Sequence, residues 1–113
     1  MSSAVRESFI ERTLVDEVRR IGGRAYKWVS PGNNGVPDRI VILPGGRVCF
    51  VELKTALGVL SPLQKIQTKV LKDLGTDTSV VYGMSGLAYW FEGHGYPESA
   101  ERVNKKLQRM VGM

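Results

Sequence analysis

Three polar side chains frame the apolar stretch from Gly35 to Lys54, and their types suit metal-assisted chemistry. Asp38 opens the run DRIVIL, and Glu52 and Lys54 close the run RVCFVELK. Carboxylate and ammonium groups in a buried strand are costly unless they are paired or bind a metal. The pattern therefore indicates either an ion pair at the end of a sheet or a centre for a divalent ion.

The turn between the two runs decides where Asp38 points, because a slip of one residue moves a side chain to the other face of a sheet. A two-residue turn at Gly45-Gly46 would direct Asp38 away from Glu52. A three-residue loop, with Pro44 in a type I turn and Gly46 in the left-handed conformation, would place Asp38 opposite Glu52. The Pro-Gly-Gly composition favours the three-residue loop.

In that register the Cβ atoms of Asp38 and Glu52 lie ~5 Å apart, with Lys54 on the same face. Two carboxylates this close repel each other unless they share a proton or bind a cation. Mg²⁺ takes oxygen ligands and keeps several waters. We therefore predict a site for Mg²⁺ or Mn²⁺, with a plain Asp/Glu/Lys ion pair as the alternative.

A third acid is predicted in the first helix. Glu11 falls inside the apolar stripe formed by Ile10, Leu14 and Val18, where an ionised carboxylate is costly unless it is paired or linked to a metal. Glu7, one turn earlier, is the rival candidate. Because Glu7 lies nearer the fraying end of the helix, the sequence favours Glu11.

The whole chain, residues 1–113, is predicted to form a single domain of the α/β class. Periodicity and turn residues predict helices at about 3–21, 61–75 and 98–109, and strands at about 24–30, 38–43, 47–54 and 78–83. The element order is therefore α-β-β-β-α-β-α. The strands are continuous apolar runs, which indicates a central sheet flanked by helices on both faces.

The helix at 61–75 carries a full set of boundary signals. Ser61 is a candidate N-cap, Pro62 occupies the first helical position and Gly75 follows the end. Gln64 has the spacing of a capping box with Ser61, but it also lies where it could order the acidic site. The sequence leaves these two roles of Gln64 open.

Composition limits the other classes of function. With 16 Lys and Arg against 11 Asp and Glu, the net charge of +5 weakly favours a polyanionic partner. The single Cys49 predicts no disulfide framework and no cysteine zinc site, and fits a reducing cytoplasm. The glycines form neither a P-loop nor a dinucleotide fingerprint, so no nucleotide cofactor is expected. No apolar run approaches the ~20 residues that span a bilayer.

The order of these motifs resembles the PD-(D/E)xK nuclease superfamily. An acid in the first helix, GVPD at a strand start, VELK on the paired strand and SPLQ at a helix start are, more narrowly, similar to the VRR-NUC (virus-type replication-repair nuclease) family in its compact stand-alone form. The resemblance covers about residues 7–82. It implies a PD-(D/E)xK-like fold with a mixed central sheet and a divalent-metal-dependent endodeoxyribonuclease in a bacterial or phage-infected bacterial cell.

The resemblance also implies roles for individual residues. Asp38, Glu52 and the main-chain carbonyl of Leu53 would bind the metal, and Glu11 would bind it directly or through water. Lys54 would be the catalytic lysine, and Gln64 would order the site. Thr68 stands where relatives with a Q-x-x-x-Y motif have tyrosine.

The expected substrate is DNA, and branched DNA such as a Holliday junction in recombination, repair or replication follows from the resemblance. Basic and polar residues near the acids are candidates for sequence-independent backbone contacts: Lys27, Asn33, Asn34, Arg39, Lys65 and Lys69. Symmetric cutting of a junction predicts a homodimer, formed by the C-terminal aromatic residues or helix. The alternatives are a non-specific or flap-type nuclease, a non-catalytic DNA-binding module that keeps the fold, and a small structural domain.

Overall fold

A four-stranded mixed sheet forms the centre of the computed structural model, which describes residues 5–112. The strands are β1 (Arg24–Lys27), β2 (Arg39–Leu43), β3 (Arg47–Lys54) and β4 (Asp77–Tyr82), in the spatial order β1-β2-β3-β4. The first three strands pair antiparallel, and β4 pairs parallel to β3. The parallel pair is joined by a crossover that contains α2 (Pro62–Asp73).

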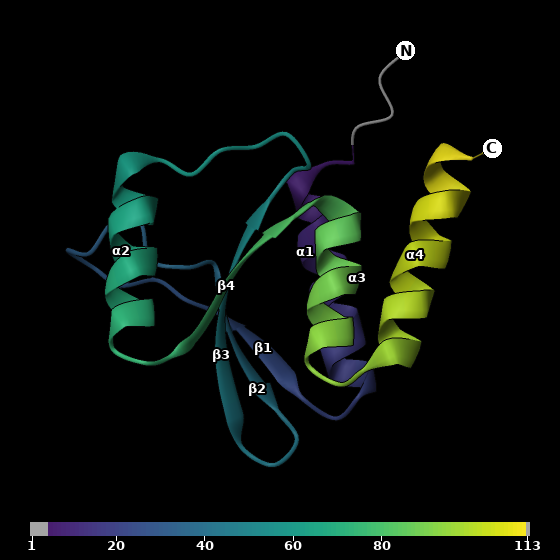
Figure 1. The fold of residues 1–113 in the computed structure, drawn as a ribbon, viewed down its shortest axis with the longest axis horizontal. Coiled ribbons are helices and arrows are strands. Elements are labelled where there is room, and N and C mark those ends of the chain that lie inside the picture. Colours follow the sequence, from purple (N-terminus) through teal and green to yellow (C-terminus); the bar gives the residue numbers. More distant parts are fainter. Residues whose placement is uncertain (1–4, 113) are drawn as a thin grey trace.

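Helices cover both faces of the sheet, as predicted (Figure 1). Helix α2 lies on one side, α1 (Glu7–Arg20) and α3 (Gly83–Gly93) lie on the other, and α4 (Pro97–Val111) packs outside α3. The fold class is confirmed, but the predicted element order omits α3. The sequence of α3, GMSGLAYWFEG, is apolar on nearly all sides, so it lacks the one-sided pattern that marks a surface helix. Among residues 5–112, no helix has the length and apolar character required to cross a membrane.

The hydrophobic core fills only the side of the sheet that faces α1 and α3. Alternate strand residues such as Val41, Val51 and Leu53 meet Leu14 and Phe91 there, all fully buried. Each such side chain stabilises the fold by about 1.5–3 kcal/mol relative to exposure. The intervening strand residues face α2, and Glu52 is one of them. The sheet therefore has a largely apolar face toward α1 and α3 and a mixed face toward α2.

The β2–β3 hairpin has the predicted register but a different turn. Leu43 pairs with Arg47, and the Gly46 N–H donates to the Leu43 carbonyl at 3.1 Å. Gly45 has a φ of +86°, which is the value for the second central residue of a type II turn, so the predicted type I turn is wrong. Glycine at this position takes the left-handed conformation without steric cost, so the bend keeps the predicted loop length.

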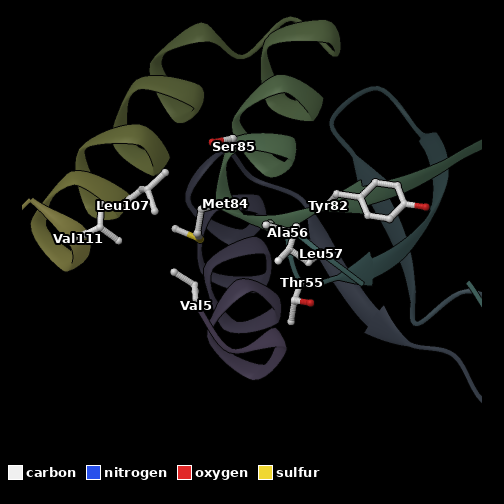
Figure 2. Close-up of a pocket in the computed structure, with 10 residues that line it drawn as sticks. Val5, Thr55, Ala56, Leu57, Tyr82, Met84, Ser85, Leu107 and Val111 are labelled. Carbon is white, nitrogen blue, oxygen red and sulfur yellow. The ribbon is translucent and has the colours of Figure 1, made fainter. Parts of the chain in front are cut away.

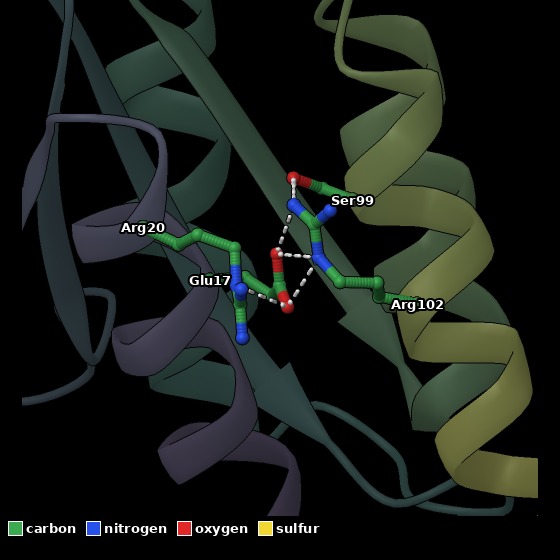
Figure 3. A network of polar contacts seen from close by, with 4 residues as sticks. All are labelled: Glu17, Arg20, Ser99 and Arg102. Carbon is green, nitrogen blue, oxygen red and sulfur yellow. Dashed lines mark hydrogen bonds and ion pairs between the residues drawn. The ribbon is translucent and has the colours of Figure 1, made fainter.

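A partly buried ion pair connects α1 to α4 (Figure 3). The Glu17 carboxylate, almost fully buried, accepts hydrogen bonds from Arg102 Nε and Nη2 at 3.0–3.1 Å, and Arg102 Nη2 also donates to Ser99 Oγ at 3.2 Å. Arg20 Nε lies 3.5 Å from the same carboxylate. A bidentate arginine offsets the cost of burying the charge, so this contact fixes α4 across the first helix.

Candidate active site

Asp38 and Glu52 lie side by side at one end of the hairpin. Asp38 is one residue beyond the last pair of the β1–β2 ladder, where its carbonyl accepts a hydrogen bond from the Trp28 N–H at 2.9 Å. Its carboxylate Oδ2 accepts from the Leu53 N–H at 2.8 Å. The β2–β3 register, extended by one pair, places Asp38 opposite Glu52. The sequence predicted this juxtaposition.

Glu52 is a buried carboxylate, and hydrogen bonds and nearby charge offset only part of the cost of burying it. The residue is 2% exposed, and its Oε2 atom contacts Gln64 Nε2 at 3.0 Å and Lys54 Nζ at 3.8 Å. The other oxygen, Oε1, is buried and has no hydrogen-bond partner within residues 5–112. An unsatisfied buried oxygen of this kind costs about 1–3 kcal/mol, and more when it carries charge.

The surroundings of Glu52 disfavour its ionised form. Burial, followed by the charge of Asp38, raises the pKa of Glu52 to about 8, and Lys54 opposes this rise. A cation placed between the two acids would reverse both effects, because it would satisfy Oε1 and offset the repulsion from Asp38. The donor set of this end of the hairpin therefore fits a hard divalent ion.

Gln64 fills both roles that the sequence left open. Its Oε1 accepts from the Ser61 N–H at 2.9 Å, and its main-chain N–H donates to Ser61 Oγ at 3.2 Å, so the capping box is complete. The amide nitrogen of the same side chain donates to Glu52 at 3.0 Å. Because one amide has a separate acceptor and donor, the start of α2 and the orientation of Glu52 are set by a single side chain.

In the first helix, Glu11 is paired with basic residues, and Glu7 is the acid whose pKa responds to Asp38. Glu11 accepts from Arg39 Nε and Nη2, both at 2.9 Å, and lies 3.6 Å from Lys27 Nζ. By contrast, burial and the charge of Asp38 raise the pKa of Glu7, against Lys54. Glu11 lies in the apolar stripe of the first helix, as predicted, but its charge is offset by Arg39 from β2.

Arg39 is therefore part of the scaffold. Its guanidinium also donates to the Ala25 carbonyl at 3.1 Å, and its side chain is 18% exposed. The prediction that Arg39 contacts DNA does not agree with this position. Sequence spacing gave no sign of the pairing with Glu11, because the partners are 28 residues apart.

The other predicted contact residues lie at the surface. Lys27, Asn33, Asn34, Lys65 and Lys69 are exposed. Asn33 Nδ2 donates to Ser30 Oγ at 3.0 Å within the loop, and Lys69 Nζ pairs with Asp73 at 2.8 Å along α2. Lys27 reaches Glu11 and keeps most of its side chain in solvent. These positions are compatible with the predicted contacts, which stay predictions.

The loop that leads into Asp38 packs against the first turn of α2. Gly35 has a φ of +93°, and a Cβ atom there would lie 2.6 Å from the main-chain carbonyl of Leu63 and 2.8 Å from the Gln64 nitrogen. Gly32 in the same loop also has a positive φ, +81°, but a Cβ would meet no atom within 4 Å. Gly35 is therefore needed both for its backbone conformation and for close contact beside Gln64.

Comparison with known proteins agrees with this geometry. The chain is 49% identical over 77 residues to "Putative nuclease p44" of Acyrthosiphon pisum secondary endosymbiont phage 1, which covers 68% of this chain and 83% of that protein. A solved "VRR_NUC domain" superimposes with a TM-score of 0.65 at 22% identity, over 88% of this chain and 94% of that one. The chain belongs to the same family as this phage protein, and its fold is that of a VRR_NUC domain. No family model matches the chain.

The structure also has an apolar pocket (Figure 2), whose lining does not include the acid pair. It has a volume of about 470 Å³ and lies between the segment after β3, the start of α3 and the end of α4. Its lining includes Leu57, Met84, Leu107 and Val111, and none of the acids discussed above. An apolar lining does not suit a phosphodiester, so the acid pair is the better candidate site.

The raised pKa of Glu52 predicts how stability depends on pH. Without divalent ions, between about pH 4.5 and pH 8 the unfolded chain has Glu52 ionised while the folded VRR-NUC domain keeps it protonated. The free energy of unfolding should therefore fall as pH rises through this window. Urea unfolding in chelator at pH 5, 6, 7 and 8 should show a steeper fall for wild type than for Glu52→Gln. An equal change in the free energy of unfolding with pH in the two proteins would contradict the raised pKa of Glu52.

A glycine pair tests the contact between the loop and α2. Gly32→Ala should cost about 1 kcal/mol, from backbone strain alone. Gly35→Ala carries the same strain plus overlap with the backbone of Leu63 and should cost about 3 kcal/mol. Urea unfolding measures both. Equal losses in the two variants would show that Gly35 is not packed against α2.

Proposed function

We propose that this VRR-NUC chain is a divalent-metal-dependent endodeoxyribonuclease that hydrolyses phosphodiester bonds of DNA. The observation that carries the proposal is the buried Oε1 atom of Glu52, which has no protein partner among residues 5–112 and lies beside the Asp38 carboxylate. A plain ion pair with Lys54 leaves that oxygen unsatisfied. A hard cation would satisfy it.

Each polar residue of the site has its own proposed role. Asp38, Glu52 and the main-chain carbonyl of Leu53 would hold Mg²⁺ or Mn²⁺. When bound, such an ion activates water and stabilises the negative charge that develops on a phosphoryl group. Gln64 holds Oε2 of Glu52, so that Oε1 would remain available to bind the ion. Glu7, rather than Glu11, is the acid of the first helix that would complete the site.

Lys54 supplies the positive charge beside the acids. Its side chain is only 16% exposed, and its Nζ lies 3.8 Å from Glu52 Oε2. An ammonium group held in this way can orient the attacking water and stabilise the additional charge on a phosphate, without having to order itself during the reaction. Lys54 is therefore the proposed catalytic lysine.

DNA would approach along the surface formed by the loop after β1 and the start of α2. Lys27 and Lys65 would meet phosphates, Asn33 and Asn34 would contact the backbone, and Lys69 would add charge at the edge. Such contacts carry no sequence information, so selectivity would come from the shape of the DNA. The phage origin of the relative supports activity on recombination, repair or replication intermediates in a phage-infected bacterial cell.

Single substitutions test the nuclease directly. Asp38→Asn and Lys54→Ala should each lower the cleavage rate by ~10²-fold or more, since each removes a charged group from the reacting centre. Lys105→Ala, in an exposed pair with Glu101 on α4, is the matched surface control and should cut at the wild-type rate. The assay compares four-way junction, flap, single-stranded and linear duplex DNA with Mg²⁺ and with Mn²⁺. Cleavage that persists in excess EDTA would refute the metal dependence, and equal rates on all substrates would favour a non-specific nuclease.

A homodimer would make junction cutting symmetric, and α2 offers the surface for it. Leu63, Ile66 and Val70 on α2 and Leu74 at its C-cap recur at helical spacing and are 46–76% exposed. The opposite face of α2, which includes Gln64, packs toward the sheet. Among the C-terminal aromatic residues, Trp90 and Phe91 lie in the core, whereas Tyr89 is exposed. We therefore propose that the stripe formed by Leu63, Ile66, Val70 and Leu74 pairs with the same stripe of a second copy.

Two lysine substitutions distinguish an interface at the α2 stripe from one in the C-terminal part. Val70→Lys would bury a like charge twice at a two-fold interface and should weaken dimerisation at least ~10-fold. Tyr89→Lys, at an exposed aromatic position of α3, should leave the dimer intact. Sedimentation equilibrium measures both. A wild-type monomer would refute the homodimer, and loss of the dimer in Tyr89→Lys alone would place the interface on the C-terminal part.

A further inference from the structure

The sole cysteine and the sole histidine of the chain contact the same carboxylate. Cys49 Sγ lies 3.4 Å from Asp77 Oδ2, and His94 Nε2 lies 2.9 Å from the same oxygen. One potential ligand atom from each residue lies within 4.8 Å of the other two. We propose that Cys49, Asp77 and His94 form a binding site for a borderline-soft divalent ion of the zinc class.

The separations of the three atoms suit such an ion. Bonds of ~2.3 Å to sulfur and ~2.0–2.2 Å to nitrogen and oxygen, in tetrahedral geometry, put ligand atoms roughly 3.2–3.6 Å apart. The Cys49–Asp77 distance of 3.4 Å already falls in this range, and the His94–Asp77 distance of 2.9 Å needs only a small increase. Three protein ligands of these types leave a fourth position for water.

The orientation of His94 is the second observation that points to a ligand. Its Nδ1 lies 2.7 Å from the Trp90 carbonyl, and because a carbonyl only accepts, Nδ1 carries the proton. In the neutral ring, the lone pair of Nε2 is then directed at the Asp77–Cys49 pair. A backbone carbonyl that fixes the tautomer in this way is the usual support of a metal-binding histidine.

Three elements meet at this cluster. Cys49 comes from β3, Asp77 is the first residue of β4, and His94 caps the end of α3. Burial and the Asp77 charge raise the pKa of Cys49 to about 12, so without an ion the thiol keeps its proton. On binding, that proton would leave to solvent and a sulfur–metal bond would take its place. The bound ion would then cross-link the β3–β4 pair to α3.

The cluster is distinct from the proposed nuclease centre. Cys49 and Glu52 are three residues apart in β3, so their side chains point to opposite faces of the sheet. Cys49 belongs to the core on the α3 side, whereas Glu52 contacts Gln64 from α2. The ligand preferences also differ, because the acid pair offers only oxygens while this site offers a thiolate and an imidazole. The expectation of no cysteine zinc site rested on cysteine number alone and could not foresee a mixed ligand set.

Cobalt(II) tests the proposal, because Cys49 is the only thiol. One equivalent of Co²⁺ added to the metal-free full chain should produce a thiolate-to-cobalt charge-transfer band, which one equivalent of Zn²⁺ should abolish and excess Mg²⁺ should not. Glu52→Gln, which alters the other centre, should keep the band. His94→Gln should weaken Co²⁺ binding by ~100-fold or more, since loss of a direct ligand costs more than loss of its support.

Thermal unfolding provides a readout that does not depend on absorbance. Zn²⁺ should raise the Tm of wild type and of Glu52→Gln, and should raise the Tm of His94→Gln by less at the same Zn²⁺ concentration. Cys49→Ser should lose the band, and circular dichroism checks that this variant is folded. Folded wild type with no charge-transfer band at millimolar Co²⁺, or a band of equal affinity in His94→Gln, would overturn the proposal and leave only a His94–Asp77 ion pair.

Discussion

The site depends on one unfavourable burial, that of the Glu52 carboxylate. The fold places this acid on β3, 2% exposed, next to a second acid, and satisfies only one of its oxygens. A buried carboxylate of this kind either keeps a proton or binds a cation. The surrounding groups fix Oε2 through Gln64, anchor Asp38 through the Leu53 N–H and hold Lys54 nearby. A divalent cation held by Asp38 and Glu52 is therefore the central element of the proposed chemistry.

The hairpin and the start of α2 position the polar groups of the site. The Pro-Gly-Gly bend sets the register that brings Asp38 opposite Glu52, and a slip of one residue would separate them. Gln64 links the N-terminal cap of α2 to Glu52, and Gly35 lets the preceding loop approach the same turn. The same turn and cap residues therefore form the elements and also align the polar groups of the site.

Sequence reasoning succeeded where local chemistry decides the structure. Turn residues gave the hairpin register, and Ser61, Pro62 and Gly75 gave the bounds of α2, because these effects act within a few residues. It failed where partners are distant in the chain. Arg39 compensates Glu11 across 28 residues, and the mostly apolar α3 gave no periodic signal. The meeting of Cys49, Asp77 and His94 likewise follows only from the packing of β4 and α3 on β3.

The most direct test of the central claim is the location of manganese in a crystal of the wild-type protein grown with Mn²⁺ near pH 7.5, read from anomalous scattering. We expect an anomalous manganese peak between the Asp38 and Glu52 carboxylates, in contact with Oε1 of Glu52, and no such peak in Glu52→Gln. Density for Mn²⁺ only elsewhere, with Oε1 still without a partner, would contradict it and leave Glu52 as a buried, protonated structural acid.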